Sequence, residues 1–192
     1  MSPSPFIVEW LERIARERGP STRLGAGADP RALDVAMGRG RHALPLARAG
    51  FRTFGVDRNL EAVRAAMAEG RREGVHIEGW CADLTSHPLP RGRFDLVVVS
   101  RYLQRDLFPA LQAAVAPAGV VIYETFTTHQ RALGRPPTSA DHLLEPGELR
   151  RHFAGFDVLC YEEVPAPDAV ARLVARSRSR SKASAGSDTL PG

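Results

Sequence analysis

Three aspartates and a glycine-rich turn follow successive apolar stretches of this sequence. The stretch LDVAMGRGRHA places Asp34 before two alternate glycines, Gly38 and Gly40. Asp57 ends the next apolar stretch, and Asp83 ends the one after that. Glycine lets a backbone approach a ligand closely, and a carboxylate can accept two hydrogen bonds from the hydroxyls of a ribose. This combination indicates a site for a nucleotide-containing cofactor.

A dinucleotide site is the main alternative for the same glycines. Gly38-x-Gly40-x-x-Ala43 satisfies the pattern G-x-G-x-x-G/A of nicotinamide enzymes. Asp34 argues against it, because a carboxylate just before the turn would repel a pyrophosphate but suits a ligand with an ammonium group. Asp83 is placed to accept a hydrogen bond from an adenine amino group. The sequence therefore favours a cofactor that carries an ammonium group and an adenosine.

Alternating strand and helix patterns determine where these residues lie. We expect strands over residues 31–36, 53–56, 76–81, 94–100, 119–125, 157–162 and 169–175, and helices over residues 5–18, 41–49, 59–69, 107–115 and 146–153. The last two strands follow each other without a helix, so they are expected to pair antiparallel. The remaining alternation predicts a three-layer α/β domain with a mostly parallel sheet.

Local signals refine these elements. Ser4 followed by Pro5 predicts a helix start with a capping hydroxyl, and Asn59 predicts a second cap. Pro45 lies near the first turn of its helix and predicts a kink or a late start. Residues 127–144 are polar and proline-rich, which is typical of a long loop. The run FDLVVVS predicts a strand that is buried on both faces.

Composition excludes several classes of protein. The chain has 192 residues and 43% hydrophobic content, which suits one globular domain. No apolar run approaches the roughly 20 residues that a membrane-spanning helix needs. The N-terminus lacks the basic region and apolar block of a signal peptide. Cys81 and Cys160 lie in different segments and are expected to be reduced thiols, so we expect a cytoplasmic protein.

The basic character of the chain comes mainly from its C-terminal end. The net charge is +4 and the isoelectric point is about 9.7, but the Ser/Arg-rich residues 176–192 carry most of the excess. This tail has no apolar periodicity and is expected to be disordered and solvated. Weak contact with RNA or an acidic surface is the alternative for the tail. Elsewhere we expect neither a nucleic-acid partner nor a membrane.

Four motifs resemble those of the class I S-adenosylmethionine-dependent methyltransferases: LDVAMGRGRHALPLA, FGVD, CADL and FDLVVVS. The resemblance covers roughly residues 30–175. It implies a Rossmann-like, seven-stranded, mostly parallel sheet with an antiparallel last strand. We expect one domain over residues 1–175, with an N-terminal helix at 5–18 and a cofactor-binding core at 30–125. Within the class, YETFTTHQRALGRPP and HLLEPGELRRHF resemble the tellurite-resistance-like methyltransferases.

The resemblance assigns roles to the cofactor-binding residues. Those around the methionine part of S-adenosylmethionine would be Asp34, Ala36, Gly38 and Gly40, with Asp57 on the ribose, Ala82 and Asp83 on the adenine, and Ser100 beside the sulfur. Ala36 stands where the family has glycine, which is tolerable if its φ is negative. Met37 stands where the family often has a small residue, and we expect it to narrow the pocket.

The acceptor of the methyl group is less clearly marked. Arg101 and Tyr102 follow the fourth strand, and His129 and Gln130 follow the fifth, so these four are candidates for the acceptor site. No general base is evident beside the expected methyl position, which favours a soft nucleophile such as a chalcogen oxyanion or a thiol. The six histidines show no metal-ligand spacing, so we expect no metal.

Several alternatives stay open at this stage. Asp34 could instead cap the following helix, Asp57 could form a turn with Asn59, and Asp83 could be an exposed loop residue. The whole chain could be a non-catalytic cofactor-binding relative that acts through its basic tail, or a nicotinamide-dependent oxidoreductase. We expect a monomer or a dimer that acts on a small molecule.

Overall fold

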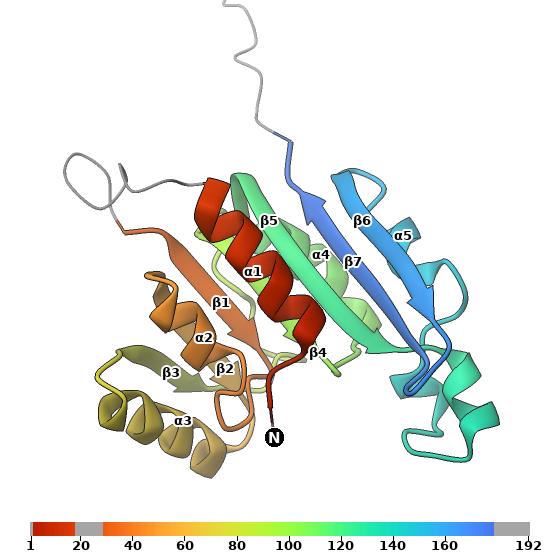
Figure 1. The fold of residues 1–192 in the computed structure, drawn as a ribbon, viewed down its shortest axis with the longest axis horizontal. Coiled ribbons are helices and arrows are strands. Elements are labelled where there is room, and N and C mark those ends of the chain that lie inside the picture. Colours follow the sequence, from red (N-terminus) through yellow and green to blue (C-terminus); the bar gives the residue numbers. More distant parts are fainter. Residues whose placement is uncertain (1, 18–28, 179–192) are drawn as a thin grey trace, which may run out of the picture.

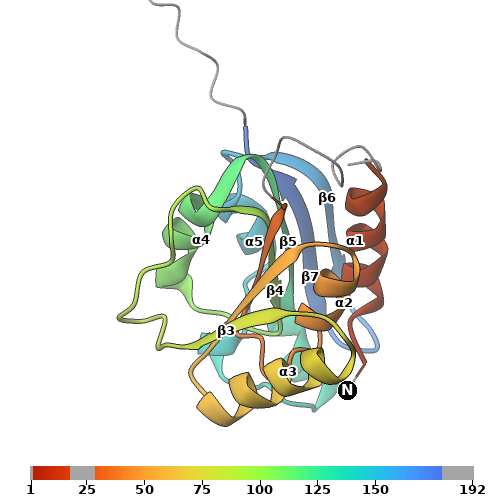
Figure 2. The ribbon, with the colours of Figure 1, turned by 90° about the vertical axis from the view of Figure 1, so that its left-hand side faces the viewer.

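The computed structural model describes residues 2–17 and 29–178. The expected end of the first helix, at residue 18, and most of the Ser/Arg-rich tail lie outside the described residues. Within them, a seven-stranded sheet is covered by helices on both faces (Figures 1 and 2). Its strands are β1 (Arg31–Val35), β2 (Arg52–Asp57), β3 (Ile77–Cys81), β4 (Phe94–Ser100), β5 (Val115–Phe126), β6 (Asp157–Val164) and β7 (Val170–Arg176).

The strand order is β3-β2-β1-β4-β5-β7-β6, and β7 runs antiparallel to both of its neighbours. The pairings among β1 to β5 are all parallel. The expected fold class is therefore confirmed. The order reverses between β1 and β4, so the carboxyl ends of these two strands flank the crevice in which α/β sheets bind ligands.

The helices divide between the two faces. One face carries α1 (Pro5–Glu17), α2 (Ala43–Arg48) and α3 (Leu60–Arg72), and the other carries α4 (Phe108–Ala114) and α5 (Glu148–His152). The apolar stripe of α1 is buried as its periodicity predicts, through Phe6, Ile7, Leu11 and Ile14. The three layers follow from these two apolar interfaces.

The near-continuous apolar sequence of the central strand β4 is explained by its burial on both faces. Leu96 and Val98 belong to the core cluster under α1, whereas Val97 and Val99 belong to the cluster on the opposite face. Successive side chains of a strand point to opposite faces, so both sets must be apolar when both faces are covered. The strand thereby holds its carboxyl end firmly at the ligand-binding edge.

Two expected local signals have different outcomes. Asn59 does cap α3, because its side chain accepts a hydrogen bond from the backbone N–H of Ala62. The prediction that the Ser4 hydroxyl caps α1 is wrong, because the Oγ atom is buried and has no hydrogen-bond partner among the described residues. Instead, the backbone N–H of Ser4 donates to Nε2 of His42 at 3.1 Å. A long-range contact therefore fixes the chain just before α1.

Other boundaries shift by a few residues. Helix α2 begins at Ala43 rather than at 41, which is the late start that Pro45 allowed. Strand β5 begins at Val115, earlier than expected, because Val115 pairs with Phe94 across an irregular stretch of the ladder. The expected loop over residues 127–144 contains two short 3₁₀ turns, Thr128–Leu133 and Ala140–His142.

Candidate functional site

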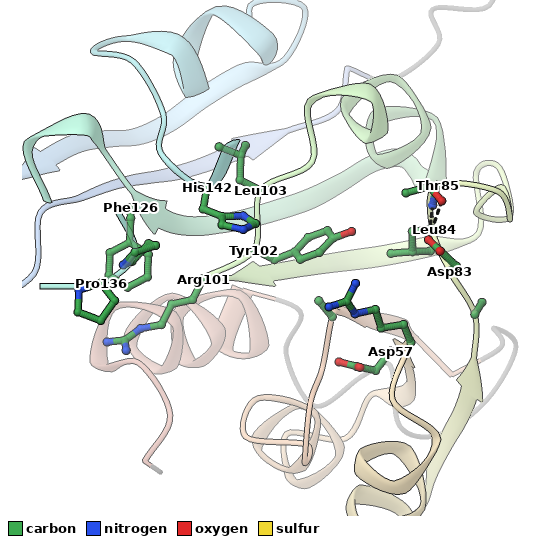
Figure 3. A pocket seen from close by; sticks show the side chains of 14 residues that line it. Asp57, Asp83, Leu84, Thr85, Arg101, Tyr102, Leu103, Phe126, Pro136 and His142 are labelled. Atoms are coloured by element: carbon green, nitrogen blue, oxygen red, sulfur yellow. Dashed lines mark hydrogen bonds between the residues drawn. The ribbon is translucent and has the colours of Figure 1, made fainter. Parts of the chain in front are cut away.

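A cleft of about 610 Å³ opens at the carboxyl ends of β1 to β5 (Figure 3). Six of the residues singled out from the sequence line it: Ala36, Asp57, Ala82, Asp83, Arg101 and Tyr102. They come from the ends of four different strands. The sheet thus brings together residues that are far apart in the chain, as expected for a ligand site at the switch point.

Asp57 holds the glycine turn from the neighbouring strand. Its Oδ2 accepts a hydrogen bond from the backbone N–H of Gly38 at 2.8 Å, and its Oδ1 accepts one from Asn59 at 2.9 Å. The turn with Asn59 is therefore real, and the carboxylate still lines the cleft. Each carboxylate oxygen can accept two hydrogen bonds, so Asp57 can also receive hydroxyl groups of a ligand.

Asp34 is not among the residues that line the cleft and is buried, with an exposed fraction of only 1%. Burial raises the pKa of its carboxyl to about 7, against the opposing effect of backbone N–H groups of Ala43 and His42 and the charge of Arg41. Its Oδ2 has no hydrogen-bond partner among the described residues. A buried oxygen without a partner is costly, and an ammonium group would satisfy it. The helix-capping contacts and the ligand role are thus compatible.

The first position of the glycine turn does not behave as expected. Ala36 has φ of +53°, so the condition under which alanine would fit without strain is not met. The left-handed region costs an L-residue roughly 1–2 kcal/mol. Among the described non-glycine residues, Arg101 at +54° also lines the cleft with a positive φ. Such strain often gathers at functional sites.

The expectation for Met37 is wrong. Its side chain does not narrow the cleft but packs into the core between the sheet and α3, with 4% exposure. The absence of a side chain at Gly55 makes room for it, since a Cβ there would lie 1.9 Å from the sulfur of Met37. Gly79 similarly faces the Met37 terminal methyl. The sequence alone could not show that β2 and β3 leave this space.

The two glycines of the turn serve different purposes. Gly38 has φ of +55° with open space around its Cα, and its N–H points to Asp57. Gly40 has φ of +82°, and a Cβ there would lie 2.8 Å from the Cβ of Ala66 in α3. Gly40 is therefore needed for helix packing as well as for its backbone conformation. Neither glycine lines the cleft itself.

Ser100 and Arg101 mark the end of β4. Ser100 is buried, and its Oγ accepts a hydrogen bond from Nη2 of Arg41 at 3.1 Å. Arg101 extends away from Tyr102 towards Phe126 (Figure 3), and its guanidinium lies over the Phe126 ring. Its Nη2 lies 2.9 Å from Oδ2 of Asp168. Arginines thus surround the end of the strand that the family resemblance assigns to the sulfur of the cofactor.

Tyr102 stands in the middle of the cleft (Figure 3). Its hydroxyl donates to Oε1 of Gln104 at 2.5 Å, and its backbone carbonyl accepts from the buried hydroxyl of Tyr123 at 2.9 Å. Burial raises the pKa of the Tyr102 phenol, and the charges of Asp83 and Asp57 add to this effect. Tyr102 therefore remains a neutral phenol.

Asp83 lies at the far end of the cleft and is exposed. Its Oδ1 accepts hydrogen bonds from the backbone N–H of Thr85 at 2.9 Å and from the Thr85 hydroxyl at 2.7 Å. These bonds lower the pKa of the Asp83 carboxyl. The residue is thus a fixed, charged acceptor at the rim of the cleft.

The structure does not bring His129 and Gln130 to the cleft. His129 is exposed and is not among the lining residues. The buried Gln130 amide instead joins two loops: its Nε2 donates to the carbonyl of Pro136 at 3.1 Å, and its Oε1 accepts from the N–H of Ala169 at 2.8 Å. Gln130 therefore supports a wall of the cleft, because Pro136 lines it.

His142 is a cleft residue that sequence reasoning missed. It ends the second 3₁₀ turn of the long loop, and its imidazole lies beside Tyr102 (Figure 3). Arg105 fixes the following residue through a 2.9 Å hydrogen bond to the carbonyl of Leu143 and also pairs with Glu148 at 2.7 Å. No spacing in the sequence points to His142, since the loop is placed by these tertiary contacts.

Two further searches concern the described residues alone. No group of three or more His, Cys, Asp or Glu side chains there gathers closely enough to hold a metal ion. No helix in that part of the chain is both long and apolar enough to cross a membrane.

Comparison with known proteins finds similar methyltransferases. Residues 32–119 match the family described as methyltransferase domain. Ubiquinone biosynthesis O-methyltransferase of Bordetella avium (strain 197N) is 25% identical over 166 residues, covering 76% of this chain and 65% of that protein. The chain thus spans a little under two thirds of this relative.

Solved structures show the same fold at low sequence identity. TehB from Haemophilus influenzae superposes with a TM-score of 0.69 at 15% identity, covering 88% of this chain and 62% of TehB. An S-adenosylmethionine-dependent methyltransferase from Mesorhizobium loti gives 0.64 at 20% identity, covering 86% of this chain and 99% of that one. Over residues 32–119 the chain is thus similar to the methyltransferase domain family, and its fold is that of S-adenosylmethionine-dependent methyltransferases of known structure. S-adenosylmethionine is the cofactor that these similarities imply.

Proposed function

We propose that this protein transfers the methyl group of S-adenosylmethionine to a small molecule. The observation that carries the proposal is the convergence of four strand ends on one cleft, together with the unsatisfied carboxylate oxygen of the buried Asp34. Asp34 is suited to the ammonium group of the cofactor and Asp57 to its ribose. Asp83 and Ala82, at the opposite end of the cleft, are suited to the adenine.

When bound, the cofactor supplies a sulfonium that makes its methyl group electrophilic. The residues of this chain then need only orient the donor and acceptor in line and exclude water. Phe126 and Leu103 line the cleft with apolar surface, and the neutral phenol of Tyr102 occupies its centre. Hydrogen bonds such as that from the Tyr123 hydroxyl to the Tyr102 carbonyl help to keep this wall in place.

The finer proposal concerns the acceptor, which we take to be a soft nucleophile, a chalcogen oxyanion or a thiol. Such nucleophiles need little or no help from a base. The imidazole of His142 lines the cleft and is suited to accept the proton of a thiol. An oxyanion acceptor has no proton to lose and needs no such base. Arg101 provides a positive charge at the same wall.

Calorimetric titration tests the cofactor first. We expect S-adenosylmethionine to bind and NAD not to bind, and Asp57→Ala to weaken the first titration. Methyl-transfer assays with selenite, small thiols and phenols then test the acceptor. Turnover of phenols alone would contradict the soft-nucleophile proposal, and absence of S-adenosylmethionine binding would contradict the function altogether.

A further inference from the structure

A second cavity of about 370 Å³ lies next to the cleft. Its walls come from the N-terminal segment 2–5, the turn between β6 and β7, and the ends of β5 and β7. None of the glycine-turn, ribose or adenine residues lines it. Arg101 lines both cavities, so its side chain forms part of the wall between them. The second cavity therefore adjoins the end of β4 from the side opposite the adenine.

Positive charge is concentrated at one end of this cavity. Arg101 and Arg135 share a single carboxylate, Asp168, at 2.9 Å and 3.8 Å. Arg41 approaches the same place, since its Nη2 donates to Ser100, the residue before Arg101. Among the residues that line the cavity, three arginines face two carboxylates, Glu124 and Asp168, and this excess of positive charge favours an anionic ligand.

At the other end of the cavity, the positive charge of Arg172 is neutralised by carboxylates. Arg172 lies between two carboxylates, with Nε 2.7 Å from Glu124 and Nη1 3.0 Å from Glu162. These acidic partners hold Arg172 in place and leave little net attraction for an anion. The asymmetry points to the Arg101 end as the place where a negative charge is stabilised.

The pKa values of two neighbouring groups, Arg41 and His42, are shifted by the same positive charges. Burial lowers the pKa of Arg41, and the charge of Arg101 lowers it further, while Asp34 and Glu124 oppose the shift. Burial also lowers the pKa of His42 to about 3, and Arg41 and Arg101 contribute. Both guanidinium groups line the second cavity, so an anion between them would offset the unfavourable interaction of their like charges.

Residues 2–5 form one wall of the cavity. The backbone N–H of Ser4 donates to Nε2 of His42 at 3.1 Å, and the Ser4 carbonyl accepts from Val8 at 3.0 Å. The neutral imidazole of His42 is needed for the first bond, because only a neutral ring nitrogen can accept. The segment 2–5, which lines the cavity, is therefore fixed in position at Ser4.

We propose that this second cavity binds the anionic group of the methyl acceptor, the carboxylate or oxyanion of a small molecule, between Arg41 and Arg101. The inference rests on the proposed function and adds where the acceptor lies and which charge it carries. A guanidinium carries five N–H donors, so Arg101 can bind an anion while it keeps its bond to Asp168.

Binding to the full chain saturated with S-adenosylhomocysteine tests the proposal. The probes are 3-mercaptopropionate and selenite, compared by calorimetry with the uncharged 3-mercaptopropionamide. We expect at least one anion to bind about tenfold or more tightly than the amide. Arg101→Met and Arg41→Met should each abolish this preference, and Arg101→Lys should retain part of it. Arg71→Met, the same change on the exposed end of α3, is the matched control.

Three outcomes would overturn the inference. The wild-type protein could show no preference for either anion, or the preference could survive both arginine substitutions. Alternatively, the arginines could hold the carboxylate of the donor. In that case the wild type would bind decarboxylated S-adenosylmethionine more weakly than the intact donor. The Arg41→Met variant would bind the two ligands with equal affinity. Failure of the wild type to bind S-adenosylmethionine at all would instead contradict the proposed function.

Discussion

The carboxylate of Asp57, at the end of β2, holds the turn that follows β1, with Oδ2 of Asp57 2.8 Å from the nitrogen of Gly38. One side chain thus both positions the turn and lines the cleft. A substitution at this position should weaken cofactor binding in two ways, through lost contacts to the ribose and through a looser turn.

We predict that Asp57→Ala lowers the affinity for S-adenosylmethionine about 10- to 100-fold, the range expected for a charged hydrogen-bonding group. Asp57→Asn should lose less, because its carbonyl oxygen can still accept one N–H. Calorimetric titration measures both. Asp157→Asn, on the exposed start of β6, serves as the control. Equal affinities for wild type and Asp57→Ala would refute the assignment.

We expect the buried carboxylate of Asp34 to favour cofactor binding but to lower the free energy of unfolding at high pH. Its pKa of about 7 in the folded protein lies above the usual value of 3.8, so the folded state binds this proton more tightly. The resulting stabilisation is complete below pH 3.8 and is lost as the pH rises towards and through 7. Above pH 7 the folded protein must bury a charged carboxylate.

Asp34→Asn should therefore be more stable than the wild type at pH 8 and not at pH 5. We expect a gain of about 1–3 kcal/mol at pH 8, after the cost of burying the amide. Urea unfolding at the two pH values measures it. The same variant should bind S-adenosylmethionine at least about tenfold more weakly. A variant that is less stable at pH 8 than at pH 5, relative to wild type, would contradict the proposed pKa.

Ala36 offers a test of backbone strain. Its φ of +53° lies in a region that glycine adopts freely, so Ala36→Gly should increase the free energy of unfolding by roughly 0.5–1 kcal/mol. Ala68→Gly, at an exposed position inside α3, should instead decrease it by a similar amount. Chemical denaturation of both variants provides the comparison. Destabilisation of the same size at both positions would show that Ala36 is unstrained.

The contact between Met37 and Gly55 predicts non-additive mutations. A Cβ at Gly55 would overlap the sulfur of Met37, so Gly55→Ala should cost about 1–3 kcal/mol. Met37→Ala alone should cost about 2–5 kcal/mol through the cavity that it leaves. In the double variant the new methyl group fills part of that cavity. Its cost should fall short of the sum by at least about 1 kcal/mol, and strict additivity would disprove the packing relationship.

Much of the fold follows from local patterns. The run FDLVVVS identifies β4, and the spacing of Phe6, Ile7, Leu11 and Ile14 identifies the buried face of α1. Asn59 caps α3 because capping depends on residues only a few positions apart. The aspartates at strand ends could be placed at one edge of the sheet because parallel strands share their carboxyl ends.

Other features were decided by contacts between distant residues. The side chain of Met37 turns into the core because Gly55 and Gly79, on β2 and β3, leave space for it. The Ser4 hydroxyl does not cap α1 because the neighbouring backbone is held by His42, far along the chain.

The candidate site also combines residues that local sequence patterns identify with residues that only long-range contacts bring together. The sequence by itself determined the order of the elements, the cofactor class and the aspartates at the strand ends, because these depend on periodicity and on short motifs. Only the tertiary structure decided that His142 enters the cleft, that Gln130 leaves it, and that Arg41 and Arg101 meet beside a second cavity. Loops carry no periodicity, and their positions are set by hydrogen bonds and ion pairs to elements that lie far away in the chain.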